Sequence, residues 1–414
     1  MTAGRGSAVT MPSRRYDVVV TGGGTAGIAA AVAAARTGAR TLLIERYGFL
    51  GGMATAGMVG TICGLYLTRA TGPPERLNGG LGAEIADRLA RLAGSEPPLR
   101  RGRTFVLPYV PHELAALADD LTVAEPTLDV LLHGYVVGVG TNAGRVDGVR
   151  IATWEGPREV EAAAIVDASG DAIAALAAGA PTETPDVDAR QLCSLVFTWQ
   201  GVAVEALHGG ASLAILRRVR EAESTGALPS GSSDLSWRPS ARPGEVVVKL
   251  ALGALDVARH GSWLTAAERE GRRRVGAIGD FLRREVPAFA AAFVSHVASQ
   301  VGVRESRRIV GRHCLTREDV LGGRRCDDGV ARAAWPIELW REGTTGAHYE
   351  YLADGDWYDV PLRCLQPTGI ARLVAAGRCI SGTSEALGSA RVIGTCLATG
   401  EAAGREAARI AATP

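Results

Sequence analysis

The stretch TGGGTAGIAAAVAAARTG, residues 21–38, constrains the fold of this chain more than any other segment. An apolar run directly before it predicts a strand over Tyr16–Thr21, and the alanine-rich segment after its glycines predicts a helix over Thr25–Thr37. A second apolar run predicts another strand over Arg40–Glu45. Strand, helix and strand within about thirty residues form a βαβ unit, which predicts a parallel sheet.

The glycines of this stretch have the spacing of the dinucleotide-binding fingerprint, G-x-G-x-x-G. In a chain with 53 glycines the spacing alone occurs about once by chance, so its position between a strand and a helix carries the signal. Gly22 permits a tight turn, Gly24 lets backbone approach a pyrophosphate, and Gly27 lets the helix lie close to the strand. The helix N-terminus then offers N–H groups to the phosphates, and Glu45 can accept hydrogen bonds from ribose hydroxyls.

The fingerprint does not distinguish a flavin from a nicotinamide cofactor. A second glycine cluster at residues 48–52 suits a longer cofactor that crosses the edge of the sheet. Near the C-terminus the sequence predicts a strand over Leu373–Ala376 and a helix over Val392–Ala412. Such a helix can bring its positive end to the negative charge of a reduced flavin. Its small residues could pack closely against the first helix; they are Gly394, Gly400 and Gly404.

The middle of the chain has a different pattern, with polar segments and runs typical of antiparallel strands. Polar residues 72–104 predict a surface excursion, and Thr265 with Glu268 has the spacing of a capping box that begins a helix ended by Pro287. The remaining predicted strands are a hairpin of Leu128–Gly138 with Arg145–Thr153, a buried strand at Ala163–Ala168, antiparallel strands at Cys193–Gln200 and Glu245–Leu252, and a strand at Gly302–Arg312.

Composition excludes several classes of partner. The net charge of +1 provides no field to attract nucleic acid or an anionic membrane. No apolar run approaches the roughly 18 residues of a membrane span. Residues 1–15 lack the apolar core of a signal peptide and predict a disordered basic tail, so we expect a cytoplasmic protein. The seven scattered cysteines have no metal-binding spacing, so we expect reduced thiols and no metal.

Four segments together are more specific than the fingerprint: VVVTGGGTAGIAAAVAAARTGARTLLIERYGFLGGMATAG (18–57), IVDASGDAIAALAAGAP (165–181), QVGVRESRRIVG (300–311) and YDVPLRCLQPTGIARLVAAGRCISGTSEALGSARVIGTCLATGEAAG (358–404). With them the chain resembles, over nearly its whole length from Tyr16, the FAD-dependent oxidoreductase family within the glutathione-reductase-like flavoproteins. The resemblance implies an α/β protein whose Rossmann-like FAD-binding domain, of three-layer ββα type, combines residues 16–190 and 358–414. A largely antiparallel α+β substrate or cap domain would occupy residues 191–357.

The resemblance also implies the cofactor, FAD, and the residues that hold it. These are Gly22, Gly24, Thr25, Ala26 and Gly27 at the pyrophosphate, Glu45 and Arg46 at the adenosine, Gly52, Met53 and Ala54 toward the flavin, Val136 at the adenine, Ala168, Ser169 and Gly170 at a second phosphate-side turn, and Gly377, Arg378, Val392 and Ile393 by the ribityl chain and isoalloxazine. Two departures stand out. Arg378 replaces an acid common after this glycine in related flavoproteins, and Ser384 and Leu387 stand where family members commonly have histidines.

The minimal chemistry is hydride transfer between a carbon of a small-molecule substrate and flavin N5, in the dehydrogenase, oxidase or ene-reductase direction. The candidate catalytic residues are Arg304, Glu305, Arg307, Ser384 and Arg391, although each arginine could instead form a structural ion pair. A flavin monooxygenase using NAD(P)H and oxygen, or an electron-transfer component without a substrate, stays open as an alternative function.

Cys63 could lie near the flavin or attach to it. The composition, rich in Ala, Arg and Gly, hints at secondary metabolism, and a homodimer is left open.

Overall fold

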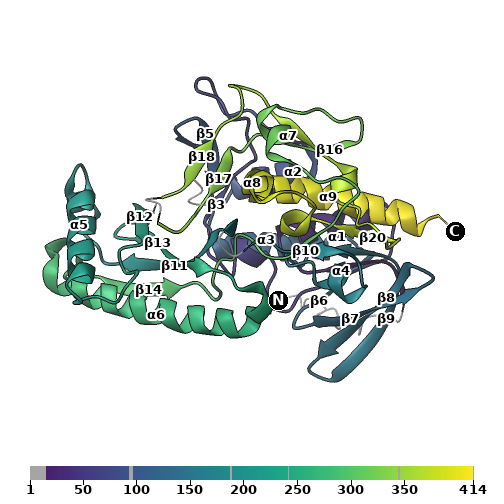
Figure 1. Cartoon of the computed structure of the whole chain (residues 1–414), viewed down its shortest axis with the longest axis horizontal. Coiled ribbons are helices and arrows are strands. Elements are labelled where there is room, and N and C mark those ends of the chain that lie inside the picture. Colours follow the sequence, from purple (N-terminus) through teal and green to yellow (C-terminus); the bar gives the residue numbers. More distant parts are fainter. Residues whose placement is uncertain (1–14, 93–96, 187–188, 241, 344–345, 414) are drawn as a thin grey trace, which may run out of the picture.

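The computed structural model describes residues 15–92, 97–186, 189–240, 242–343 and 346–413. The tail predicted for residues 1–15 therefore lies outside the described residues, except for Arg15, which begins the first strand. Two main sheets organise the chain, one mostly parallel and the other antiparallel, and they lie at different ends of the molecule (Figure 1). No helix among the described residues is long and apolar enough to span a bilayer.

The larger sheet is built around the strand that precedes the glycine-rich turn. β1 pairs in parallel with β2 on one side and β9 on the other; β2 pairs with β6, and β20 pairs with the end of β9. The start of β9 continues into antiparallel β8 and β7. The parallel sheet predicted from the sequence is therefore present. Its strands are β6 (Leu128–Leu131), β2 (Thr41–Ile44), β1 (Arg15–Thr21), β9 (Gly156–Asp167), β8 (Arg145–Thr153), β7 (Tyr135–Asn142) and β20 (Leu373–Ala375).

The parallel strands of this sheet form the middle of three layers. On one face Val18 and Val20 pack into a core formed with the helices α1 (Thr25–Arg36) and α9 (Ile393–Ala411). On the other face Val19 packs into a separate core with residues of β7, β8 and the short helix α4 (Ile173–Ala177). Helices therefore cover one face of the parallel strands, and the antiparallel strands β7 and β8 cover the other. This is the three-layer ββα arrangement predicted above.

The first and last helices lie against each other, although they come from opposite ends of the chain (Figure 1). A Cβ atom on Gly400 would lie 2.2 Å from the carbonyl oxygen of Ala26, and one on Gly404 would lie 2.1 Å from that of Ala30. The predicted close packing is thus confirmed for these two glycines. It is wrong for Gly394, where a Cβ would instead lie 2.4 Å from the carbonyl carbon of Gly64.

The antiparallel sheet forms the cap over the first body. Its strands run in the order β12 (Leu235–Pro239), β13 (Val246–Ala254), β11 (Leu192–Gln200) and β14 (Phe293–Val297). One face packs on α6 (His260–Glu285) through a core that includes Trp199, whose ring meets Phe197 and Phe289 edge-on. The strands predicted at Cys193–Gln200 and Glu245–Leu252 are therefore confirmed as β11 and β13.

Smaller elements complete both bodies: α2 (Gly80–Leu89) packs in the core of the first body, and α5 (Ala211–Ser224) packs in the core of the cap. The remaining strands and helices of the described chain are β3 (Thr61–Ile62), α2 (Gly80–Leu89), β4 (Leu99–Arg101), β5 (Thr104–Pro108), α3 (Pro111–Val123), β10 (Thr182–Glu183), α5 (Ala211–Ser224), β15 (Arg308–Ile309), α7 (Arg317–Leu321), β16 (Gly329–Ala333), β17 (Ile337–Leu339), β18 (His348–Glu350), β19 (Tyr358–Pro361) and α8 (Ser384–Ala390).

Three predictions about strands and surface segments are wrong. The strand expected over Leu128–Gly138 is divided, because His133 adopts a left-handed φ of 57° and Gly134 donates to the carbonyl of Glu45. The strand expected over Gly302–Arg312 shrinks to the two residues of β15. The excursion expected at residues 72–104 contains α2, whose apolar face is buried under α9.

The capping box expected at Thr265 is absent because α6 begins earlier, at His260. The Thr265 hydroxyl donates to the carbonyl of Gly261 in the preceding turn, and the Glu268 carboxylate accepts from the amide of Val301. A short 3₁₀ turn capped by Asp256 leads into the helix instead. The predicted end is confirmed, since α6 stops at Glu285, two residues before Pro287.

Candidate active site

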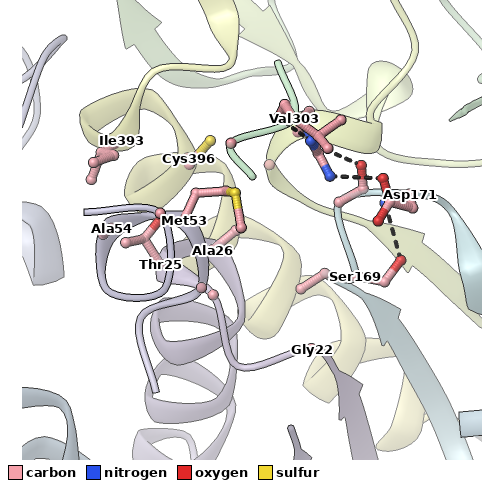
Figure 2. Close-up of a pocket in the computed structure, with 18 of the residues that line it drawn as sticks. Gly22, Thr25, Ala26, Met53, Ala54, Ser169, Asp171, Val303, Ile393 and Cys396 are labelled. Atoms are coloured by element: carbon pink, nitrogen blue, oxygen red, sulfur yellow. Dashed lines mark hydrogen bonds and ion pairs between the residues drawn. The ribbon is translucent and has the colours of Figure 1, made fainter. Parts of the chain in front are cut away.

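A cavity of about 290 Å³ lies between the two bodies of the chain. Its floor is formed by the turn before α1, the second glycine cluster, the turn after β9 and the start of α9, and its far wall by one face of the cap sheet. Figure 2 shows Met53 beside Thr25 and Ala26 of α1, with Ile393 and Cys396 of α9 on one side and Ser169 and Asp171 on the other. Segments from both ends of the sequence therefore surround one space.

The glycines of the first turn leave a bare backbone trough. Gly22 has a φ of 99°, and a Cβ there would lie 2.7 Å from the carbonyl oxygen of Ala168, so only glycine fits without strain. Gly24 and the second cluster approach each other closely, since a Cβ on Gly52 would lie 2.8 Å from the Cα of Gly24. A ligand in this trough meets main chain, not side chains.

The chemistry of the trough suits a diphosphate. The first turn of α1 carries no acidic residue, and the positive end of the helix faces the cavity. Beside it, the Glu45 carboxylate is held by backbone amides, accepting from Gly23 at 2.7 Å and from Tyr47 at 2.9 Å. Arg46 stacks on the Tyr47 ring and donates to Gln300. A fixed acid next to an anion-binding turn is the arrangement that holds a dinucleotide's ribose and phosphates.

The arginine that replaces the expected acid after Gly377 has a buried partner. Arg378 pairs with Asp171 at 2.7 Å and donates to the carbonyl of Gly170 at 2.9 Å, while the Ser306 hydroxyl also donates to Asp171. Burial alone would raise the pKa of Asp171, but the charge of Arg378 and the Ser306 hydroxyl outweigh it and hold the pKa below its usual range. The acid is therefore present in space, contributed by a different segment of the chain.

The cavity's other end, against the cap, is rich in charge. The Glu338 carboxylate accepts from the indole nitrogens of Trp335 at 2.8 Å and Trp340 at 2.6 Å. Burial alone would raise the pKa of Glu338, but the charge of Arg391 and the two indole hydrogen bonds outweigh burial and hold the pKa below its usual range. The carboxyl group is therefore an anion at neutral pH. Arg304 stacks on the Trp340 ring at 4.7 Å.

The two arginines at this end carry charge that the protein only partly neutralises. Burial and the like charge of Arg391 lower the pKa of Arg304 to about 10, which leaves it protonated at neutral pH. Arg391 donates to the side-chain oxygen of Gln191 at 3.0 Å, but its buried Nε has no partner among the described residues. This end of the cavity therefore suits an anionic group.

A family model described as FAD dependent oxidoreductase matches residues 17–413. The chain belongs to the FAD-dependent oxidoreductase family. It is therefore a flavoenzyme, and FAD is its cofactor. The bare trough, the α1 N-terminus and the fixed Glu45 fit the diphosphate and adenosine of FAD.

Solved structures resemble this flavoenzyme at low identity. A geranylgeranyl bacteriochlorophyll reductase-like protein from Thermoplasma acidophilum has 16% identity and a TM-score of 0.45, and the match covers 96% of this chain and 78% of that one. The flavin-dependent brominase Bmp2 has 14% identity and a TM-score of 0.48, covering 97% and 80%. The anhydrotetracycline hydroxylase OxyS from Streptomyces rimosus has 16% identity and a TM-score of 0.41, covering 72% and 54%.

Most residues predicted to hold FAD line the cavity, namely Gly22, Gly24, Thr25, Ala26, Glu45, Arg46, Gly52, Met53, Ala54, Val136, Ala168, Ser169, Gly170, Gly377, Arg378, Val392 and Ile393. Gly27 does not appear in the lining. A Cβ there would lie 1.8 Å from the carbonyl oxygen of Gly22, so this glycine lets α1 close onto the turn. It shapes the cofactor site by packing.

The predicted catalytic residues divide into two groups. Arg304 and Arg391 line the cavity, whereas its described lining leaves out Glu305, Arg307 and Ser384. Glu305 and Ser384 instead surround the guanidinium of Arg308, at 3.0 Å and 3.4 Å. Arg307 donates to the carbonyl of Asp171. A catalytic role for these three stays a prediction that this placement does not favour, because none of them is in the described lining and each contacts another protein group.

Cys63 lines the cavity, as the sequence left open. Burial raises the pKa of its thiol to about 12, so the group stays protonated and unreactive near neutral pH. This state does not favour attachment of the flavin through sulfur.

The site residues predicted from the sequence did not include three charged residues of the cavity lining: Asp171, Lys249 and Glu338. A signal for one was available. Among 45 basic residues, 44 are arginines, and Lys249 is the single lysine of the chain. Asp171 and Glu338 had no distinguishing pattern, because only the fold brings them to the site.

Proposed function

We propose that this flavoenzyme transfers hydride between a carbon of a small carboxylic acid and flavin N5, in the dehydrogenase, oxidase or ene-reductase direction. The single observation that carries the proposal is the pair Arg304 and Arg391 at the capped end of the cavity, with one buried guanidinium nitrogen left unpaired among the described residues. Guanidinium groups bind carboxylates through two parallel hydrogen bonds. The three-layer core also supports placing the enzyme among glutathione-reductase-like flavoproteins.

Each side chain has a role in this proposal. Bound FAD supplies a two-electron acceptor or donor at N5. Arg304 and Arg391 bind and orient the substrate carboxylate. The Glu338 carboxylate, fixed by two indoles, offsets part of the repulsion between the positive charges of Arg304 and Arg391. The cap sheet closes the space over the substrate and limits access of water, which strengthens these charge interactions.

The test uses the purified yellow protein without oxygen. We expect flavin absorbance to bleach on mixing with members of a panel of small hydroxy and amino acids, or chemically reduced flavin to regain its colour with unsaturated acids. Arg391→Met should raise the acid concentration needed for half-maximal change by at least about tenfold, since losing one partner of a desolvated charge pair costs about 2–5 kcal/mol. Arg283→Met, on the exposed face of α6, is the control.

Two outcomes would replace the proposal. Rapid flavin reduction by NAD(P)H alone, followed by oxygen consumption with an aromatic acceptor, would indicate a monooxygenase. Reduction only by a protein electron donor, with no response to any acid of the panel, would indicate an electron-transfer component. Either result would remove the role given to Arg304 and Arg391.

A further inference from the structure

The one lysine of this chain occupies the cavity. Lys249 lies on β13 opposite Val196 of β11, and both line the cavity together with Ser194. Its strand neighbours Val248 and Leu250 point the other way, into the buried core of the cap. Strand alternation therefore directs the lysine out of the cap core and toward the flavin cavity.

The amine of Lys249 has no protein partner among the described residues, whereas its neighbours do. Arg304 donates to the carbonyl of Leu192 and stacks on Trp340, Arg391 donates to Gln191, and Glu338 accepts from its two indoles. A half-buried ammonium without a partner is unfavourable. The arrangement leaves Nζ available to a bound molecule.

The surrounding groups favour the neutral amine. The charged or titratable groups that Lys249 senses are Arg304 before β15, Arg238 on β12, Glu338 on β17 and Cys63 after β3. Burial is the largest influence and lowers the pKa of Lys249; the charge of Arg304 lowers it further, and Glu338 opposes both. Because the Cys63 thiol stays protonated, it adds no charge near neutral pH.

Arginine and lysine differ in the property that matters here. A guanidinium keeps its proton at any physiological pH, whereas an amine can lose its proton when buried near other cations. This chain uses arginine for 44 of its 45 basic residues, and the exception stands in the cavity. A need for a side chain that can take up and release a proton accounts for a lysine, and not an arginine, at position 249.

We infer that Lys249 is the proton-transfer residue of the site, and that the substrate is a carboxylic acid with a hydroxyl or amino group on the carbon that is oxidised. In the oxidative direction the substrate C–H bond gives up hydride to the flavin, which is the oxidant. The O–H or N–H bond breaks, its proton passes to the neutral Nζ, and a C=O or C=N bond forms. The inference rests on the proposed hydride-transfer function.

The first test needs no substrate. Reductive methylation of the holoprotein with ¹³C-formaldehyde labels only amines, so Nζ of Lys249 is the single side-chain signal. We expect its NMR titration midpoint to lie below the value of about 10.4 typical of free lysine, because burial and the charge of Arg304 lower the pKa of this amine. A midpoint at or above the free value, or no labelling of Nζ in the folded holoprotein, would overturn the inference. Arg259→Lys, whose side chain is 80% exposed, adds a reference amine that should titrate normally.

The second test compares variants. Lys249→Arg keeps the charge but cannot release the proton, so we expect retained flavin, little change in half-saturating acid, and a reduction rate lower by about 10²–10⁴-fold. The rise of the wild-type rate with pH through the lysine midpoint should disappear, and added methylamine should partly restore Lys249→Ala. A wild-type rate and pH profile in Lys249→Arg would overturn the inference.

The two tests separate two kinds of failure. If no acid of the panel alters the flavin of the wild type, the proposed function fails, and the substrate part of this inference fails with it. If acids do reduce the flavin but the amine titrates normally, only the role of Lys249 is lost.

Discussion

At the scale of single residues, the pairing of Asp171 with Arg378 shows how charge is arranged in this flavoenzyme. Related flavoproteins commonly place an acid after the late glycine, and this chain has Arg378 there. The fold compensates through Asp171, whose side chain is only 10% exposed and contacts Arg378 at 2.7 Å. The pair links the turn after β9 to the segment after β20, two parts of the FAD cradle that are distant in sequence.

We expect Asp171→Asn to destabilise the protein by about 3–5 kcal/mol, because it leaves the partly buried charge of Arg378 without its partner. The free energy of unfolding in urea measures this loss. Asp280→Asn is the matched control, since Asp280 is 62% exposed and pairs with Arg283 on the surface of α6. Surface pairs of this kind are worth about 0–1 kcal/mol. Equal losses in the two variants would contradict the assignment.

Acid should affect the wild type more than this variant. Because the folded protein lowers the pKa of Asp171, its contribution is fully present above the unfolded value of about 3.9. That contribution is lost as the pH falls through the lower folded value. Urea unfolding below about pH 4 should therefore show a smaller difference between wild type and Asp171→Asn than at pH 7. A difference that stays constant would argue against the ion pair.

We expect Gly22→Ala to release flavin and to lower stability beyond the cost of its backbone conformation. A Cβ there would press on the carbonyl oxygen of Ala168 at 2.7 Å. Gly38→Ala is the matched control, because Gly38 has a similar φ of 92° and no atom within 4 Å of the added Cβ. The control should lose only about 1 kcal/mol and keep its flavin. Flavin absorbance per protein and thermal midpoint decide between these outcomes.

At the scale of secondary-structure elements, the contact between α1 and α9 holds the two ends of the chain together. Ten of the twelve residues of α1 are buried, and its alanines leave room for backbone approach. Gly400 and Gly404 use that room, as their missing Cβ atoms show. Both helices also begin at the cavity, so their spacing fixes where their positive ends meet the cofactor.

We expect Gly404→Ala to destabilise the protein by about 1–3 kcal/mol, because the added methyl would lie 2.1 Å from the Ala30 carbonyl oxygen and force the helices apart. Gly276→Ala in α6 is the control, since Gly276 lies within a helix and has no atom within 4 Å of the added Cβ. The control should gain about 0.5–1 kcal/mol from helix propensity. Thermal and urea unfolding of the two variants would test the opposite signs.

At the scale of the whole molecule, three segments that are distant in sequence line the cavity that we expect to hold FAD. The turn before α1, the turn after β9 and the start of α9 all line the cavity, and the cap sheet covers it. The unfolded chain cannot offer this arrangement. Cofactor binding is therefore coupled to the stability of the complete fold.

We expect FAD added to apoprotein to raise the free energy of unfolding with the logarithm of FAD concentration, by about 4 kcal/mol at a thousandfold excess over Kd. The thermal midpoint should rise accordingly. FMN should raise it less, because it lacks the adenosine that Glu45 and Arg46 are placed to bind. A scanning fluorimetry titration with both cofactors measures this. Equal shifts from FMN and FAD would contradict the assignment of the Glu45 end.

Predictions from the sequence were correct where the structure depends on consecutive residues. A strand, a bare glycine turn and a thin helix predicted the parallel sheet and the diphosphate site, since turn geometry and helix N-termini depend on consecutive residues. The same rules found the last helix. They failed at His133 and Thr265, where a left-handed residue and an earlier helix start were decided by contacts with other segments.

Which polar groups share the cavity depends on long-range packing and could not be predicted from the sequence. Glu305 and Ser384 looked suitable by their place in family-like segments, but the fold turns them toward Arg308. Asp171, Lys249 and Glu338 come from three separate elements, and no spacing along the chain relates them. Long-range packing sets which face of each strand and turn points inward, and therefore which side chains meet the substrate.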